Sequence, residues 1–126
     1  MQPTTEKLAS IRTIDLTTIG RRSGQRHRIE IWWFHEDGRF IITGSPGRRD
    51  WYANVLADPR VSIHVDEHDL DAIALPIEDP EERRRLFRAS RFDWYRTQAE
   101  LEELVEGSPM VEIRIGQREL GNPIEM

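Results

Sequence analysis

Apolar residues at every second position recur in six short stretches, and this alternation constrains the fold more than any other feature of the chain. The pattern is typical of half-buried strands and predicts them near 11–18, 27–35, 39–45, 60–66, 72–77 and 111–115. The Asp37-Gly38 pair between two of these stretches is a strong hairpin signal, because glycine tolerates positive φ. Six short strands with few helices indicate a small β-barrel or a strongly bent sheet.

Helical signals separate the later strands. They predict helices over 51–57, 80–90 and 94–105, the last closed by Gly107. Asp50 and Asp79 are the expected N-caps of the first two, and Pro80 suits the first position of a helix. A length of 126 residues is that of one ordinary domain, so we expect 1–126 to form a single domain.

The composition excludes several classes of protein. The chain has no cysteine, which rules out disulfides, thiolate metal sites and cysteine nucleophiles. No apolar stretch approaches the ~18 residues of a membrane helix, and the N-terminus lacks an apolar signal core. We therefore expect a cytoplasmic protein without an integral membrane segment.

Positive charge gathers in one short segment of a chain whose formal charge is −5. Residues 20–28 contain four arginines and a histidine but no acidic residue: Arg21, Arg22, Arg26, His27 and Arg28. A general nucleic-acid binder is expected to have a broader basic face, whereas a local cluster suits a small anionic ligand. The glycines and hydroxyls in this loop are typical of an anion-binding turn, and an ordinary solvated hairpin turn is the alternative.

A second arginine-bearing loop joins a strand to the start of the first expected helix. It runs from Gly44 through Arg48 and Arg49 to Asp50. Helix N-termini favour phosphate, so the two loops together could hold one anionic ligand. The alternative is a flexible connector.

Trp32 and Trp33 are adjacent in one strand, so alternation sends them to opposite faces. One can lie in the core, and the other needs a helix, a subunit or a ligand against it. The four histidines lack metal-ligand spacing, and we assign no metal site. No hydrolase motif is present either, which favours chemistry supplied by a cofactor.

Five segments stand in a fixed order along the chain. They are Leu16-Thr-Thr-Ile-Gly-Arg-Arg-Ser-Gly-Gln25, Ile29-Glu-Ile-Trp-Trp33, Asp37-Gly38-Arg39, Trp51-Tyr-Ala-Asn-Val55 and Ala57-Asp-Pro-Arg-Val61. Together they resemble the deazaflavin (F420)-dependent nitroreductase and quinone reductase family, whose split β-barrel is related to pyridoxamine-phosphate-oxidase-like flavin proteins. The likeness covers roughly residues 13–78.

The resemblance implies a mainly β (α+β) fold, a six-stranded split β-barrel with flanking helices that binds coenzyme F420. The residues that it implies for cofactor binding come from two loops, two strands and a helix. They are Arg21, Arg22, Ser23, Gly24, Glu30, Trp32, Thr43, Gly44, Ser45, Trp51 and Asn54, and we add Arg48 and Arg49 for the anionic tail. Trp94 and Tyr95 are the nearest candidates for residues that line a substrate site.

The same resemblance implies an F420H2-dependent oxidoreductase that transfers hydride to a quinone, a nitroaromatic or a similar electron-poor acceptor. Two alternatives stay open: an FMN-binding split-barrel reductase, and a non-catalytic flavin or deazaflavin carrier. An RNA-binding module is disfavoured because a second basic face is absent. The expected partners are a small-molecule acceptor and a second copy of the chain in a homodimer, with no nucleic acid.

Overall fold

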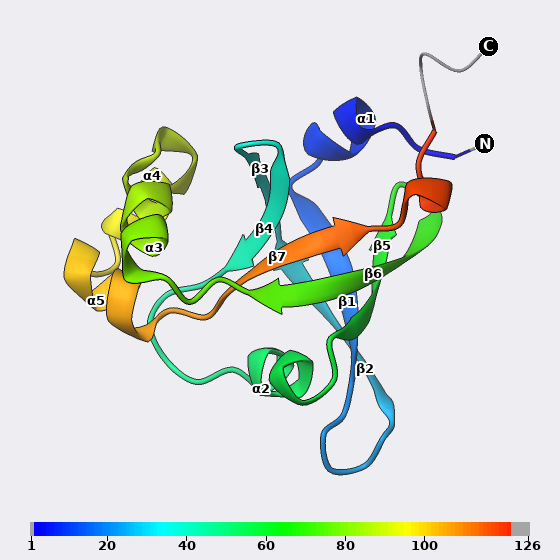
Figure 1. The fold of residues 1–126 in the computed structure, drawn as a ribbon, viewed down its shortest axis with the longest axis horizontal. Coiled ribbons are helices and arrows are strands. Elements are labelled where there is room, and N and C mark those ends of the chain that lie inside the picture. The colour runs from blue at the N-terminus through cyan, green and yellow to red at the C-terminus, as the bar shows by residue number, and fades with distance from the viewer. Residues whose placement is uncertain (1, 122–126) are drawn as a thin grey trace.

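In the computed structural model, which describes residues 2–121, seven antiparallel strands form one curled sheet (Figure 1). The strands are β1 (Thr13–Ile19), β2 (Arg26–Trp32), β3 (Phe34–Glu36), β4 (Arg39–Thr43), β5 (Arg60–Val65), β6 (His68–Pro76) and β7 (Met110–Ile115). Their order across the sheet is β2-β1-β5-β6-β7-β4-β3. The mainly β prediction is confirmed, although the expected six strands are seven.

The additional strand arises because the stretch predicted at 27–35 breaks at Trp33. Thr13 pairs with Trp32 at the end of β2, whereas Phe34 pairs with Ile41 of β4. The chain therefore changes its hydrogen-bonding partner at Trp33, whose backbone N–H donates to Arg12 O at 2.9 Å. A pattern of period two does not show such a change, since both strands keep the same alternation.

Two tight hairpins shape the sheet, and the sequence predicted one of them. Asp37 and Gly38 both have positive φ, 55° and 72°, which confirms the two-residue turn between β3 and β4. Asp66 and Glu67 form a second turn of this kind, with φ of 50° and 64°. That turn lacks glycine, so the prediction missed it and began the following strand at 72 instead of His68.

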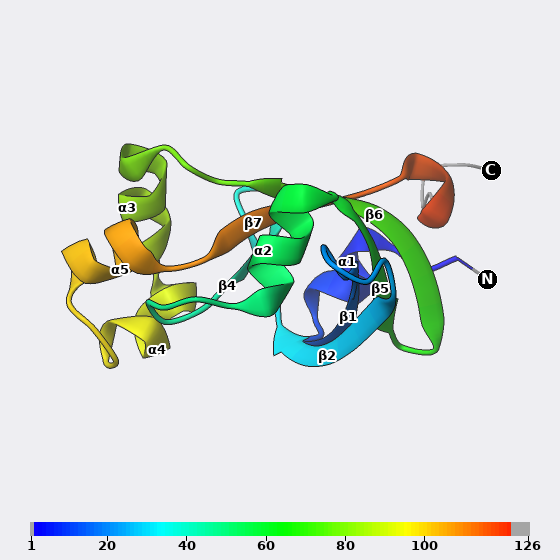
Figure 2. The same ribbon diagram turned by 90° about the horizontal axis from the view of Figure 1, so that it is seen from below.

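Within residues 2–121, five α-helices and two 3₁₀ helices flank the sheet. They are α1 (Thr5–Ala9), α2 (Asp50–Ala57), α3 (Pro80–Arg88), α4 (Asp93–Arg96), α5 (Leu101–Gly107), η1 (Ser90–Phe92) and η2 (Gln117–Glu119). Helices α3, α4 and α5 gather beyond one end of the sheet, and α2 lies across its middle (Figure 2).

Helix boundaries differ from the predicted ones at several places, and α3 ends at Arg88 instead of residue 90. Arg49, with extended backbone, occupies the N-cap of α2, so the prediction of Asp50 as the cap was wrong by one residue. The expected segment 94–105 is two helices, because Glu100 is extended and forms a capping box with Glu103 that starts α5 afresh. Asp79 and Pro80 take their predicted places at the start of α3.

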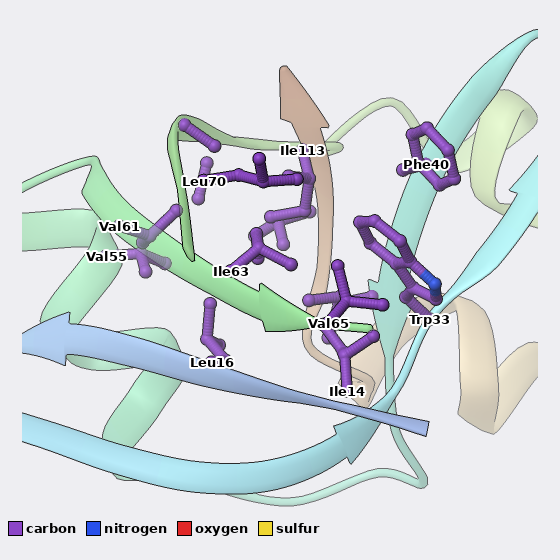
Figure 3. Close-up of a cluster of buried hydrophobic side chains, with 14 of the residues drawn as sticks. Ile14, Leu16, Trp33, Phe40, Val55, Val61, Ile63, Val65, Leu70 and Ile113 are labelled. Atoms are coloured by element: carbon purple, nitrogen blue, oxygen red, sulfur yellow. The ribbon is translucent and has the colours of Figure 1, made fainter. Parts of the chain in front are cut away.

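The buried side chains form two clusters. The main core fills the curled sheet, where Ile14, Leu16 and Ile63 point toward the same interior (Figure 3). Within it the rings of Trp33 and Phe40 stack with centroids 4.1 Å apart. The second cluster joins the β3–β4 end of the sheet to the distal helices: Phe34, Ile41, Ile77, Leu86, Phe87, Phe92, Tyr95, Leu104, Val105 and Met110.

The two tryptophans lie on opposite faces, as alternation predicts. Trp33 is buried in the main core and donates its indole N–H to Ile11 O at 2.8 Å. Trp32 is half-buried and packs at the edge of the second cluster, 5.5 Å from the ring of Trp94. Both rings thus have partners inside the chain.

Candidate functional site

The turn between β1 and β2 is a compact loop built on two glycines. Gly20 N donates to Gln25 O at 2.7 Å, and Gly24 N donates to Gly20 O at 2.8 Å. Gly24 has a φ of 73°, which favours glycine. A Cβ on Gly20 would come within 2.7 Å of His27 Nε2 and 2.8 Å of Ser23 Oγ. The loop therefore requires glycine at 20 in order to hold those two polar side chains together.

Asn54 of α2 fixes this loop to the rest of the protein. Its side-chain oxygen accepts from Arg21 N at 3.1 Å and from Arg21 Nη1 at 2.8 Å. Its Nδ2 donates to Thr18 Oγ1 at 3.1 Å, and both side chains are buried. Arg21 also pairs with Asp50 at 3.3 Å. The basic turn is thus held against the first two turns of α2 before any ligand binds.

A cavity of about 330 Å³ lies between the turn, β2 and α2. Its lining consists of Thr18, Gly20, Arg21, Arg22, Ser23, His27, Ile29, Asp50, Trp51 and Asn54. Arg21 shares its charge with Asp50, whereas Arg22 is exposed and has no carboxylate partner within residues 2–121. We refer to this space as the turn cavity. Its uncompensated positive charge and hydroxyls suit a phosphate or carboxylate.

The structure brings together five of the predicted site residues in the turn cavity: Arg21, Arg22, Ser23, Trp51 and Asn54. Gly24 shapes the same turn. Trp51 is only 7% exposed and belongs to the main core, so it offers the cavity only a small part of its surface. The side chains of Arg21 and Asn54 already hydrogen-bond to other residues of the protein. Arg22 and Ser23 are therefore the groups best placed to bind a ligand.

The residues predicted at the end of β4 and in the second loop do not line this cavity. Thr43 is buried and donates its hydroxyl to Pro109 O at 2.5 Å. The guanidinium of Arg49 folds back onto its own loop, with Nη2 3.1 Å from Ser45 O and Nη1 3.1 Å from Arg48 O. Gly44 is partly buried, while Arg48 is exposed two residues before α2.

Glu30 and Trp32 lie farther from the turn. Glu30 is exposed on β2 and lines a separate cleft together with His64 and Asp69. Trp32 faces Trp94, which is 50% exposed, and the guanidinium carbon of Arg12 lies 5.5 Å from its ring centroid. These two predicted residues therefore occupy places separate from the turn cavity.

The aromatic group around Trp94 includes a buried tyrosine. Tyr95 lies 5.2 Å from Trp94, centroid to centroid, and is 4% exposed. Burial raises the pKa of Tyr95 to about 12. Its phenol consequently stays protonated through the neutral pH range.

The predicted cofactor contacts did not include five residues that line the turn cavity: Thr18, Gly20, His27, Ile29 and Asp50. For His27 and Ile29 the signal was present in the strand pattern. Thr18 pairs with His27 across β1 and β2, and alternation then puts Ile29 on the same face. Within residues 2–121 no group of three or more His, Asp or Glu side chains could hold a metal ion. No helix in the described part is long and apolar enough to cross a membrane.

Comparison with known proteins gives one family and several solved structures. The family model described as F420H(2)-dependent quinone reductase matches residues 2–106. An F420-H2-dependent reductase has 25% sequence identity and a TM-score of 0.59, covering 81% of this chain and 93% of that one.

Two further structures share the fold at lower identity. A FAD-binding protein from Mesorhizobium loti has 21% identity and a TM-score of 0.65, covering 90% of this chain and 87% of its own. A structure described as a domain-swapped dimer has 24% identity and a TM-score of 0.60, with 88% and 87% covered. These likenesses confirm the split-barrel fold.

Proposed function

The chain belongs to the F420H(2)-dependent quinone reductase family, and we propose that it passes hydride from reduced F420 to a quinone or a similar electron-poor acceptor. Its class as an F420-dependent reductase follows from the family. The acceptor and the cofactor contacts are the proposal. The observation that carries them is the turn cavity, where Arg22, Ser23 and His27 converge beside α2.

The residues of the turn cavity fit the anionic part of such a cofactor. Arg22 supplies a guanidinium that no described carboxylate neutralises, and Ser23 supplies a hydroxyl beside it. A volume of about 330 Å³ lies at the low end of small-molecule sites, so the cavity suits one segment of such a cofactor, and its positive charge favours the phosphate-bearing segment. Arg48, exposed on the loop before α2, would add a cation for a longer anionic tail.

The chemistry supplied by F420, when bound, is the donation of hydride. The residues of this chain bind the cofactor, orient it and shield it from water. Arg22 and Ser23 hold the anionic end, and Asn54 keeps their loop in place. The protein increases the rate by holding the hydride donor and the acceptor about 3–3.5 Å apart in the right orientation. The proton that completes reduction of a quinone is drawn from solvent, so the proposal needs no general acid.

The acceptor side of the proposal is the aromatic group at Trp32 and Trp94. Half of the Trp94 surface is exposed, and its ring stands at 72° to that of Trp32. A flat, electron-poor ring gains apolar burial and edge or face contacts on such a surface. Arg12 adds positive charge beside it, which favours the electron density that a quinone acquires on reduction.

Pairing of two copies is a separate part of the proposal, supported by the neighbour described as a domain-swapped dimer. Trp32 and Trp33 give no support to a dimer, because both rings pack against residues of the same chain. Leu56 of α2, 54% accessible, is apolar surface that a second copy could cover. Light scattering of the purified protein measures the molar mass directly, and a monomer at all concentrations would remove this part.

The activity is tested by mixing the protein with reduced F420 under nitrogen and adding a soluble naphthoquinone or a nitroaromatic. We expect the cofactor to be oxidised only when both protein and acceptor are present. Binding of F420 without turnover over the acceptor panel would instead identify a carrier. A yellow, flavin-fluorescent preparation that oxidises a nicotinamide would identify an FMN reductase, and either result overturns the proposal.

A further inference from the structure

Three side chains on the outer face of the sheet form a hydrogen-bonded series unrelated to the turn cavity. Thr17 Oγ1 lies 2.7 Å from His64 Nε2, and His64 Nδ1 lies 2.6 Å from Asp69 Oδ1. A hydroxyl, an imidazole and a carboxylate within hydrogen-bond reach in this order make up the arrangement of nucleophile, base and orienting acid. The sequence could not show it, because the three residues lie on three different strands.

The sheet register builds this series. His64 of β5 is directly opposite Asp69 of β6, and Thr17 of β1 is opposite Ser62, two residues before His64 on the same face. Thr17 is 6% exposed, and the side chain of His64 is 14% exposed. Neighbouring strands of a paired sheet are stiff, so the geometry does not depend on a mobile loop.

The carboxylate end fixes the roles of the two ring nitrogens. The hydrogen bond from His64 holds the pKa of Asp69 below its usual range, so this group is an ionised acceptor. Because an ionised carboxylate can only accept, His64 Nδ1 carries a hydrogen, and Nε2 is the ring nitrogen that faces the Thr17 hydroxyl. Asp15, opposite His64 in β1 and bound to Arg28 at 2.8 Å, is a second carboxylate near the ring.

Thr17 lines a cavity of about 590 Å³, larger than the turn cavity. Ile19, Ile73 and Ile115 give it apolar walls, and Arg26 Nη2 donates to Ser62 Oγ at 2.9 Å beside Thr17. The other charged residues that line it are Arg60, Asp71, Arg114, Arg118 and Glu119. It lies on the outer face, whereas adjacent Thr18 lines the turn cavity on the inner face. The outer cavity is thus distinct from the proposed cofactor site.

We propose that Thr17, His64 and Asp69 form a second active site that hydrolyses small carboxylic esters with apolar acyl groups. Thr17 Oγ1 attacks the ester carbonyl carbon while its proton moves to His64 Nε2. The carbon–oxygen bond to the alcohol breaks, and the alcohol leaves with that proton. Water, activated by the same imidazole, then releases the acid and restores Thr17. Arg26, which donates to Ser62 beside Thr17, would stabilise the developing negative oxygen.

The test uses the full chain without F420 and p-nitrophenyl butyrate as the substrate. Thr17→Val removes the hydroxyl with little change in shape, and we expect it to lower kcat/KM by about 100-fold or more. His64→Gln should have a comparable effect, while Thr17→Ser should retain activity because it keeps the nucleophile. His68→Gln is the matched control, since His68 is a histidine on the same surface outside the series.

A covalent readout separates nucleophilic catalysis from general reactivity of surface imidazoles. After reaction with a fluorophosphonate probe, peptide mass spectrometry should locate the adduct on Thr17, and His64→Gln should suppress it. F420 binding, on the other face, reports that each variant is folded. Wild-type hydrolysis no faster than that of His64→Gln, full activity of Thr17→Val, or an adduct elsewhere would each overturn the proposal.

Discussion

Replacing Asn54 with alanine tests the structural basis of the turn cavity. The substitution removes the partner of Thr18 Oγ1, in a residue that is 1% exposed, and the acceptor of Arg21 N. A buried polar group left without a partner costs about 1–3 kcal/mol. Arg21 N is only part-buried and adds about 1 kcal/mol at the low end of that range, so the free energy of unfolding should fall by about 2–4 kcal/mol. For a domain of this size that corresponds to a fall in Tm of roughly 10 °C.

The same change should weaken cofactor binding, because the free protein loses the loop geometry that the ligand needs. We expect the Kd for F420 to rise about tenfold, equivalent to about 1.4 kcal/mol of lost preorganisation. Urea unfolding gives the stability change, and fluorescence titration below the lowered Tm gives the affinity. Tyr52→Phe is the matched control on the same helix and should alter stability by less than about 0.5 kcal/mol.

The two readouts together decide the interpretation. If Asn54→Ala unfolds like the wild type, the three hydrogen bonds do not hold the turn. If stability falls but the Kd stays the same, the loop does not need Asn54 in order to bind the cofactor. Either result would refute the reasoning that links α2 to the basic turn.

Three other predictions concern separate parts of the molecule. Trp94→Ala should raise the KM for a quinone several-fold and leave the Kd for F420 unchanged. An equal increase in both constants would show that the Trp94 ring does not act on the acceptor alone. Arg83 of α3 is 7% exposed and donates to Val105 O and Ser108 O at the end of α5 and to Ile77 O before α3. Arg83→Met should therefore lower the free energy of unfolding by about 3 kcal/mol or more, measured in urea. Hydrogen bonds from Arg60 lower the pKa of Asp58 to about 2, so this pair stabilises the fold above the usual carboxyl pKa and loses that effect as pH falls toward 2. Asp58→Asn should therefore be less stable than the wild type at pH 6 and equal to it near pH 2, and a difference independent of pH would contradict this.

Alternation carried most of the fold prediction, because it reflects directly which side chains face the interior. It failed where the cause is not local. At Trp33 the chain changes its partner strand while the alternation of apolar residues continues. The Asp66–Glu67 turn has positive φ although it contains no glycine that would have predicted it. These features are set by long-range pairing, which no window of neighbouring residues contains.

The functional site was predictable only where its residues are neighbours in the sequence. Arg22 and Ser23 are close in sequence to the glycines that shape their turn, so the basic loop was visible as a motif. Thr43 looked like a ligand residue, yet its hydroxyl is bonded to the distant Pro109 O. Whether a polar side chain faces a ligand or binds the protein's own backbone depends on such distant partners.

Titration of the protein with F420, followed by cofactor fluorescence, tests the central claim most directly. Wild type, Arg22→Ala and the exposed control Arg91→Ala are compared at low and moderate salt, with FMN in a parallel series. We predict F420 binding that weakens about 10- to 100-fold in Arg22→Ala, since a charge-assisted hydrogen bond contributes about 1.5–3 kcal/mol, and no change in Arg91→Ala. Preference for FMN, or equal F420 affinity in all three proteins, would contradict the claim that the basic turn holds the anionic end of F420.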